Sequence, residues 1–252
     1  MPDFSGKVAL VTGAGSGIGR ATALAFARAG AAVAVAVRSP AGGAETVRRI
    51  EQAGGRAVLV LADAGKPRDI ERMVGETAAR LGGLHFAFNN AGTVGDPGPL
   101  HETSEESWDA VLATNLSGVF LAMKHEIAHM LAHGGGAIVN NGSGASVMPA
   151  VGMTAYTAAK HGVLGLTKVA AKEYTGRGVR VNAVCPGLIE TPQMMRYIGD
   201  NQDVIAGALA TIPAGEMGTG DDIANAVVWL CSSEARYVSG ETLFVDGGVM
   251  CR

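Results

Sequence analysis

Short apolar runs rich in valine, leucine and alanine recur along the chain. They lack the strict alternation of polar and apolar residues that marks a half-exposed strand, so they predict strands covered on both faces. The runs are Val8–Val11, Ala32–Val37, Ala57–Leu61, Leu84–Phe88, Ala137–Asn140, Val179–Val184 and Thr242–Val245. Each is short enough for one buried strand, so we expect about seven strands.

Longer stretches between these runs carry apolar residues at spacings of three and four, which predicts helices. The clearest are Gly19–Ala29, Ile70–Leu81, Trp108–Leu131, Tyr156–Tyr174 and Asp222–Cys231. This alternation implies right-handed crossovers and a doubly wound parallel α/β sheet with helices on both faces, with ligand loops at the carboxyl ends of the strands. No Pro- or Ser-rich linker or repeat divides the 252 residues, so we expect one domain over residues 1–252.

Residues 190–220 interrupt the helical pattern with Thr-Pro, Met-Met and Ile-Pro pairs and several glycines. A loop of this length in a compact domain usually has a function. We expect a mobile lid over the substrate, and a plain surface insertion is the alternative.

Composition narrows the possible partners. With 48% hydrophobic and 17% charged residues, the chain is not a disordered protein or a coiled coil. A net charge of -3 offers no positive field for nucleic acid, and the apolar stretch Ala31–Val37 falls short of the roughly 20 residues of a membrane span. Three scattered cysteines form neither a disulfide framework nor a metal-ligand cluster. We therefore expect a soluble cytoplasmic protein without metal.

A glycine-rich loop, residues 12–19 with the sequence TGAGSGIG, directly follows the first predicted strand and opens a helix. Small residues let backbone N–H groups and the helix N-terminus approach a pyrophosphate, while Gly19 allows helix and strand to pack closely. A glycine pattern by itself could be an ordinary tight turn, but its position between strand and helix favours a dinucleotide site.

The end of the second predicted strand indicates which dinucleotide binds. An acidic residue commonly holds the adenosine ribose there, whereas this chain has Arg38. A guanidinium can form paired, charge-assisted hydrogen bonds with a 2′-phosphate, so NADP(H) is favoured and NAD(H) remains possible. Alternatively, Arg38 is a solvated residue at a strand end, and this position does not select between NADP(H) and NAD(H).

Tyr156 and Lys160 are four residues apart, which places a phenol and an ammonium on the same face of a predicted helix. A phenol with an ordinary pKa of about 10 needs a nearby cation to act as an acid or base near neutrality. Lys160, together with a positively charged nicotinamide, can supply that field. Ser143, at the end of the fifth predicted strand, can hydrogen-bond a substrate carbonyl and hold it beside Tyr156.

Several motifs in this order resemble the short-chain dehydrogenase/reductase family. They are TGAGSGIG at 12–19, Asn89-Asn90-Ala91-Gly92, Asn115 within Thr114-Asn115-Leu116, Ser143, Tyr156, Lys160, Cys185-Pro186-Gly187 followed by Thr191, and Val245-Asp246-Gly247-Gly248. The resemblance runs nearly from end to end. It implies a Rossmann fold and an NAD(P)-dependent oxidoreductase acting on CH–OH and C=O groups of a small molecule.

The resemblance also implies roles for individual residues. Tyr156 exchanges a proton with the substrate oxygen, Ser143 positions that oxygen, Lys160 binds the nicotinamide ribose and lowers the pKa of Tyr156, and Asn115 holds a water of a proton relay. The implied cofactor contacts are Gly13, Ser16, Gly17, Ile18, Gly19, Arg38, Asp63, Ala64, Asn90, Ala91, Gly92, Tyr156, Lys160, Pro186, Gly187, Ile189 and Thr191. Structural roles remain open for Asn115, for Asp63 as a turn residue and for Thr191 as a helix cap.

Two positions depart from the family pattern. His85 stands where many members have an acidic residue, which puts a supporting hydrogen bond in doubt, and Gly142 replaces a serine that is not catalytic. His161 follows Lys160, but the next position of a helix points about 100 degrees away. We expect His161 to be a packing or surface residue.

Residues after the fourth and fifth predicted strands and in the lid, most of them apolar, are the candidates for the substrate pocket. They are Val94, Ser143, Val147, Met153, Leu188, Met194 and Met195, some of which could instead be ordinary core filling. Methionine and valine favour a small or medium apolar ketone, aldehyde or secondary alcohol. Imine reduction, epimerisation or a non-catalytic nucleotide-binding regulator are the alternatives. The family resemblance also implies a homotetramer or homodimer.

Overall fold

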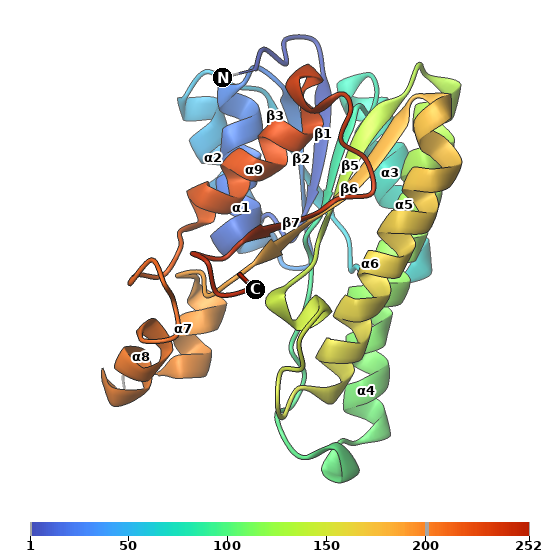
Figure 1. Cartoon of the computed structure of the whole chain (residues 1–252). Coiled ribbons are helices and arrows are strands. Elements are labelled where there is room, and N and C mark those ends of the chain that lie inside the picture. Colours follow the sequence, from blue (N-terminus) through green and yellow to red (C-terminus); the bar gives the residue numbers. More distant parts are fainter. Residues whose placement is uncertain (1, 200–201, 252) are drawn as a thin grey trace.

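The computed structural model describes residues 2–199 and 202–251, and it has a seven-stranded parallel sheet at its centre (Figure 1). The strand order is β3-β2-β1-β4-β5-β6-β7, and every neighbouring pair is parallel. The strands are β1 (Val8–Thr12), β2 (Ala32–Val37), β3 (Ala57–Leu61), β4 (Phe86–Asn89), β5 (Gly136–Asn141), β6 (Val179–Pro186) and β7 (Thr242–Val245). The predicted doubly wound α/β sheet is confirmed.

Helices cover both faces of this sheet. They are α1 (Gly17–Arg28), α2 (Pro40–Gln52), α3 (Pro67–Leu81), α4 (Glu105–Leu112), α5 (Gly118–Ala132), α6 (Thr154–Tyr174), α7 (Pro192–Ile198), α8 (Gln202–Leu209) and α9 (Gly220–Cys231). Short 3-10 turns lie at Leu100–Glu102, Gly144–Ser146, Thr175–Arg177 and Ser233–Ala235. None of the helices in the described parts of the chain has the length and apolar composition needed to cross a membrane.

Alternating strand residues divide the core into two layers. Val11 and Val33 pack with Phe26 of α1 and Val227 of α9 on one face of the sheet. On the other face, residues such as Leu10 pack with side chains of α3, α5 and α6, among them Met73, Val119, Met130 and Val163. Because both layers are apolar, the continuous hydrophobic runs of the strands follow directly from burial on two sides.

Two helical features differ from the prediction. The sequence analysis did not identify α2, whose Gly42 and Gly43 weaken the helical signal and which buries few of its residues. The expected helix Trp108–Leu131 is interrupted by a π-helical turn at Ala113–Ser117, and Asn115 is fully buried within that turn. A π turn widens the helix locally and often marks a functional position.

The segment 190–220 is more regular than a loop, because it contains α7 and α8. Its two ends are held together. Ile189 forms an isolated β-bridge with Gly218, and Glu190 N donates to Gly218 O at 2.8 Å. Helices α7 and α8 project beyond the sheet on the side opposite α4 (Figure 1). That this segment closes over a substrate stays a prediction.

A buried polar cluster lies between β4, β5, α5 and α6. Asn89 Nδ2 donates to Asn140 Oδ1 at 3.1 Å and to Glu126 Oε2 at 3.0 Å, while Asn140 Nδ2 donates to Thr167 Oγ1 at 2.9 Å. All four residues are fully or almost fully buried. Burial raises the pKa of Glu126 to about 7, and its hydrogen bond with Asn89 acts in the opposite direction.

We expect the Glu126→Gln variant to be more stable than the wild type at pH 8. The folded protein holds the proton of Glu126 up to about pH 7, whereas an unfolded glutamate loses it near its ordinary pKa of about 4.3. Stability contributed by the neutral form is therefore lost as the pH rises through this window, by at most about 4 kcal/mol. Urea unfolding of both proteins at pH 4.5 and pH 8 measures it, and an equal difference at both pH values would contradict the assignment.

Candidate functional site

The carboxyl ends of the central strands bring the predicted residues to one edge of the sheet. Thr12 ends β1, and its Oγ1 accepts hydrogen bonds from the backbone N–H groups of Asn90 and Ala91 at 2.9 and 3.0 Å. Asn90 follows β4, and its Nδ2 donates to Thr12 O at 2.9 Å. These bonds tie the start of the glycine loop to the segment after β4.

Close backbone approach explains the glycines of residues 13–19. Gly13 and Gly17 have φ angles of 65° and 49°, in the left-handed region that favours glycine. A Cβ atom at Gly19 would lie 2.7 Å from Asn90 Nδ2, and one at Gly17 would lie 3.1 Å from Thr191 Cγ2. Ser16 is the N-cap of α1, and Ile18 packs on the core. The loop therefore has the compact form of a phosphate-binding turn that leads into a helix.

Arg20 supports this loop and was not identified from the sequence. Its Nε donates to Thr46 Oγ1 at 3.0 Å, and its Nη2 donates to the carbonyl oxygens of Gly15 and Gly42. Thr46 is fully buried and in turn donates to Ala14 O at 2.8 Å. Arg20 and Thr46 thus fasten α2 to the glycine loop. The glycine pair at the start of α2 was the available signal, because it permits this close approach.

Arg38 and Asp63 lie at the ends of neighbouring strands. Arg38 is exposed directly after β2, next to Ser39, the N-cap of α2, whose side chain makes no capping bond. Asp63, after β3, accepts a hydrogen bond from Gly65 N at 3.0 Å, and its own N–H donates to Asp69 Oδ2 at 3.0 Å. The carboxylate of Asp63 therefore shapes the turn that also contains the half-buried Ala64.

Ser143 caps the 3-10 turn that follows β5. Its Oγ accepts from Ala145 N at 3.1 Å, while its N–H donates to Ser146 Oγ at 3.1 Å. The preceding Gly142 is required by packing, since a Cβ there would lie 2.6 Å from Cys185 Sγ. This explains the departure at Gly142: the Cys185 thiol occupies the space that a side chain would need.

Tyr156 and Lys160 lie in the first two turns of α6. Lys160 Nζ is 5.5 Å from the centre of the Tyr156 ring and donates to Asn141 O at 2.6 Å. Lys160 is 4% exposed, and burial lowers the pKa of its ammonium to about 8. Burial also raises the pKa of the Tyr156 phenol, whereas hydrogen bonding with Ser143 lowers it. For Tyr156, removal from water thus outweighs the lowering by the hydrogen bond with Ser143.

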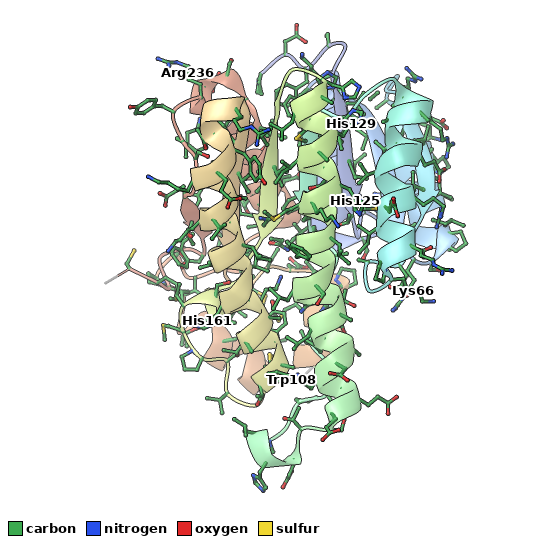
Figure 2. All side chains as sticks on the ribbon, turned by 90° about the vertical axis from the view of Figure 1, so that its right-hand side faces the viewer. Lys66, Trp108, His125, His129, His161 and Arg236 are labelled. Atoms are coloured by element: carbon green, nitrogen blue, oxygen red, sulfur yellow. The ribbon has the colours of Figure 1, made fainter. Side chains whose placement is uncertain are left out.

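Packing between α4 and α6 holds Tyr156 in place. Trp108 and Leu112 of α4 surround a small cluster with Tyr156, Ala155 and Ala159. Figure 2 shows Trp108 near the lower ends of these helices, and α4 continues through the π turn into α5.

Asn115 uses its side chain to hold the segment after β4. Its Oδ1 accepts from Thr93 N at 2.9 Å, and its Nδ2 donates to Thr93 O at 2.7 Å. A Cβ at Gly92 would lie 3.3 Å from Asn115 Oδ1. The amide is thus paired with loop backbone rather than with backbone of its own helix.

The segment after β6 carries the remaining predicted cofactor residues. A Cβ at Gly187 would lie 2.7 Å from Asp246 Cα, so Pro186-Gly187 passes close to the end of β7. Ile189 is 4% exposed, and Thr191 Oγ1 accepts from Met194 N at 3.1 Å as the N-cap of α7. The capping alternative for Thr191 is present in the structure, and its methyl group also faces Gly17.

The candidate pocket residues come from three segments, which follow β4, β5 and β6. Val147 is 45% exposed and precedes the half-buried Met153, near α6. Leu188, Met194 and Met195 are half-buried at the start of 190–220, and Val94 is half-buried after β4. A separate cavity of about 660 Å³ lies at the amino ends of the strands, lined by residues such as Lys7, Arg28 and Arg56. It is at the opposite edge of the sheet from Tyr156, so it is not the candidate site.

The two histidines of the sequence analysis have peripheral positions. His85 accepts from Val8 N at 3.1 Å through Nδ1, so it supports β1 in place of an acidic residue. His161 is exposed on α6, and Figure 2 shows it on the outer surface of that helix. Within residues 2–199 and 202–251, no group of three or more His, Cys, Asp or Glu side chains could hold a metal ion.

Known proteins share this arrangement over nearly the whole chain. The profile of the family described as Enoyl-(Acyl carrier protein) reductase matches residues 13–250. The cyclohexanol dehydrogenase of Acinetobacter sp. (strain SE19) is 41% identical, over 97% of this chain and 95% of that protein. The chain belongs to the short-chain dehydrogenase/reductase family.

Two further family members extend the comparison. The 3-oxoacyl-[acyl-carrier-protein] reductase FabG of Escherichia coli (strain K12) is 40% identical, over 98% of both chains. A protein of Agrobacterium tumefaciens assigned as a 2-deoxy-d-gluconate 3-dehydrogenase, solved with bound NADP, superimposes with a TM-score of 0.91 at 37% identity, over 99% of this chain and 98% of that one. The family prediction is confirmed, and this short-chain dehydrogenase/reductase is an NAD(P)-dependent oxidoreductase of CH–OH and C=O groups.

We expect Gly142→Ser to lower the free energy of unfolding by about 1–3 kcal/mol, because its Cβ must displace Cys185 Sγ. The double variant Gly142→Ser/Cys185→Ala should regain most of that loss, since alanine vacates the space. Urea denaturation of the wild type, both single variants and the double variant measures the coupling. Strictly additive effects would show that the thiol is not what excludes a side chain at Gly142.

Proposed function

We propose that this chain is an NADP(H)-dependent carbonyl reductase or secondary alcohol dehydrogenase for small or medium apolar substrates. The observation that carries the proposal is the placement of Tyr156 and Lys160 one helical turn apart, with Lys160 Nζ bonded to Asn141 O two residues before Ser143. Tyr156 and Lys160 are then near the hydroxyl that would position a substrate oxygen.

Tyr156 is the proton donor for a carbonyl oxygen in reduction and the acceptor of the hydroxyl proton in the reverse direction. Burial raises the pKa of its phenol, so it is protonated at neutral pH before reduction. Ser143 Oγ sits at the tip of the 3-10 turn, where it can donate a hydrogen bond to the same oxygen and orient it. The nicotinamide, when bound, supplies or accepts the hydride.

Lys160 binds the nicotinamide ribose and provides a positive charge beside the phenol. Because the pKa of its ammonium is about 8, Lys160 is mostly protonated and positively charged at pH 7. One N–H bond is directed to Asn141 O, and an ammonium has two further donors for ribose hydroxyls and water. Because the Asn115 amide holds Thr93, a relay water at Asn115 would bind the backbone of the π turn.

The residues of the adenosine side fit NADP(H). The exposed guanidinium of Arg38, the uncapped start of α2 and Ser39 lie together, and such a group of donors suits a 2′-phosphate. The remaining contacts are expected from the glycine loop, Asp63 with Ala64, Asn90 to Gly92, and Pro186 to Thr191. The relative with bound NADP supports this choice.

Apolar lining favours a neutral substrate of modest size, such as a cyclic secondary alcohol. Val147, Met153 and Met194 are uncharged and partly or largely accessible, and methionine adapts readily to the shape of an apolar substrate. The name of the cyclohexanol dehydrogenase from Acinetobacter supports this class, whereas the FabG relative is named for an acyl carrier substrate. A homodimer or homotetramer, as the family implies, would cover the exposed Phe120 of α5 and Val169 of α6.

Tyr156→Phe should lose at least about a hundredfold in kcat while NADPH binding stays unchanged, because only the transferable proton is removed. Tyr174→Phe, at the far end of the same helix, is the matched control and should keep wild-type turnover. Steady-state reduction of cyclohexanone and fluorescence titration with NADPH measure both quantities. Near-normal kcat in Tyr156→Phe would defeat the acid/base assignment.

Arg38→Asp should invert the cofactor preference, because a carboxylate repels a 2′-phosphate and accepts hydrogen bonds from ribose hydroxyls. The kcat/KM ratio of NADPH to NADH should fall at least about tenfold. Arg177→Asp, an equally exposed position at the amino end of β6, controls for net charge. An unchanged ratio in Arg38→Asp would remove Arg38 from cofactor selection.

A further inference from the structure

The ends of β4 and β5 carry two consecutive asparagines each, Asn89-Asn90 and Asn140-Asn141. The registered pair Asn89 and Asn140 ends the ladder between the two strands, and the side chains of this pair hydrogen-bond on the face that packs against α5 and α6. Asn141 Nδ2 donates to Asn90 Oδ1 at 3.0 Å. Since successive residues of a strand point to opposite faces, this second pair lies on the other side of the sheet.

The Asn90–Asn141 bond stands where the ladder has ended. Asn141 is paired with Val184 of β6, and the next residue, Gly142, donates to Val184 O at 2.7 Å. On its β4 side, Asn141 lies beyond the last registered pair. The side chain of Asn141 therefore connects this peptide to Asn90, the residue after β4. Asn90 Nδ2 in turn donates to Thr12 O at the end of β1.

The peptide held in this way is the one that binds the lysine of α6. Asn141 O accepts from Lys160 Nζ at 2.6 Å, so the position of this carbonyl decides where the ammonium sits. A continuous chain of hydrogen bonds thus runs from Thr12, beside the glycine loop, through Asn90 and Asn141 to Lys160.

The choice of asparagine at position 141 has a cost. Asn141 Oδ1 is buried and has no hydrogen-bond partner among the described residues. An unpaired buried carbonyl lowers stability, and leucine, which has the same branching and the same number of side-chain heavy atoms but no polar group, would avoid that loss. A side chain kept despite this cost is consistent with a task at the active edge.

We propose that Asn141 is a positioning residue, which holds its own carbonyl, through Asn90, where it binds Lys160. The inference goes beyond the proposed function in assigning this residue, and its effect on turnover rests on that function. Asn141 itself need not touch the substrate. It replaces a missing ladder bond at the point where the strand must present a carbonyl to the lysine.

The test reads Lys160 directly in the full-length protein without cofactor. The 13Cε resonance of Lys160, assigned with Lys160→Met, is titrated from pH 6 to pH 11 in the wild type and in Asn141→Leu. Within the described residues, the titratable groups near Lys160 are Tyr156 on α6 and Cys185 on β6, and the wild type and Asn141→Leu both retain them. Loss of a well-aligned carbonyl should lower the midpoint by at least about 0.5 pH unit, because the ammonium loses a stabilising acceptor.

Asn182→Leu is the matched control. Asn182 is also a buried asparagine of the sheet, 1% exposed, and it bonds Val238 O and Glu241 N away from Lys160. It should lower the thermal midpoint of unfolding without moving the Lys160 titration. An equal shift in Asn182→Leu and Asn141→Leu would overturn the proposal, because general loosening of the sheet would then explain both.

Asn90→Ala reaches the same bond from its other end and serves if Asn141→Leu does not fold. It should lower the Lys160 midpoint in the same direction, and the double variant should show no further lowering. An unchanged midpoint in a folded Asn141→Leu or Asn90→Ala protein would overturn the proposal. A lowered Lys160 midpoint in either variant, together with a kcat reduced about threefold, supports the proposal. Full turnover by Lys160→Met would instead defeat the proposed function, and it would leave the titration result intact.

Discussion

A parallel sheet covered on both faces presents free backbone groups at the edge where its strands end. Along the strands most side chains pack in one of two apolar layers, so the runs are largely hydrophobic. At the carboxyl ends the ladder stops and backbone groups need new partners. Thr12, Asn90 and Asn141 supply these partners in this chain, and the residues around them are the ones that can meet a cofactor and a substrate.

Desolvation controls the electrostatics of this edge. Burial lowers the pKa of Lys160 and raises that of Tyr156, so in the cofactor-free chain both groups are shifted toward their neutral forms. Lys160 Nζ also donates to the carbonyl oxygen of Asn141, and such an acceptor favours the charged form of an ammonium. On the face that packs against α5 and α6, burial also shifts Glu126 toward its neutral form, and Asn89 and Asn140 connect it with the ladder. The buried polar groups of the sheet thus depend on hydrogen bonds with neighbouring residues, although Asn89 Oδ1, Glu126 Oε1 and Asn141 Oδ1 have no partner among the described residues.

Close packing explains several choices that look arbitrary in the sequence. Gly142 is small because Cys185 fills its space, and Gly19 is small because Asn90 and Gly13 lie against it. Arg20 and Thr46 join α2 to the glycine loop, so the start of α2 and Arg38 are presented beside the same loop. Most of these contacts join residues that are distant in the sequence, so local spacing alone does not predict them.

The sequence alone determined the strands, most helices and the order of the motifs, because these depend on local periodicity and on short spacings. Tyr156 and Lys160 had to share a helix face, and the glycine loop had to follow a buried strand. The tertiary structure decided the rest: the polar helix α2, the π turn around Asn115, the two helices within 190–220, and the contacts of Arg20 and Asn141. Those features depend on partners distant in the chain, and a hydrogen bond between Asn90 and Asn141 exists only because parallel pairing brings the ends of β4 and β5 together.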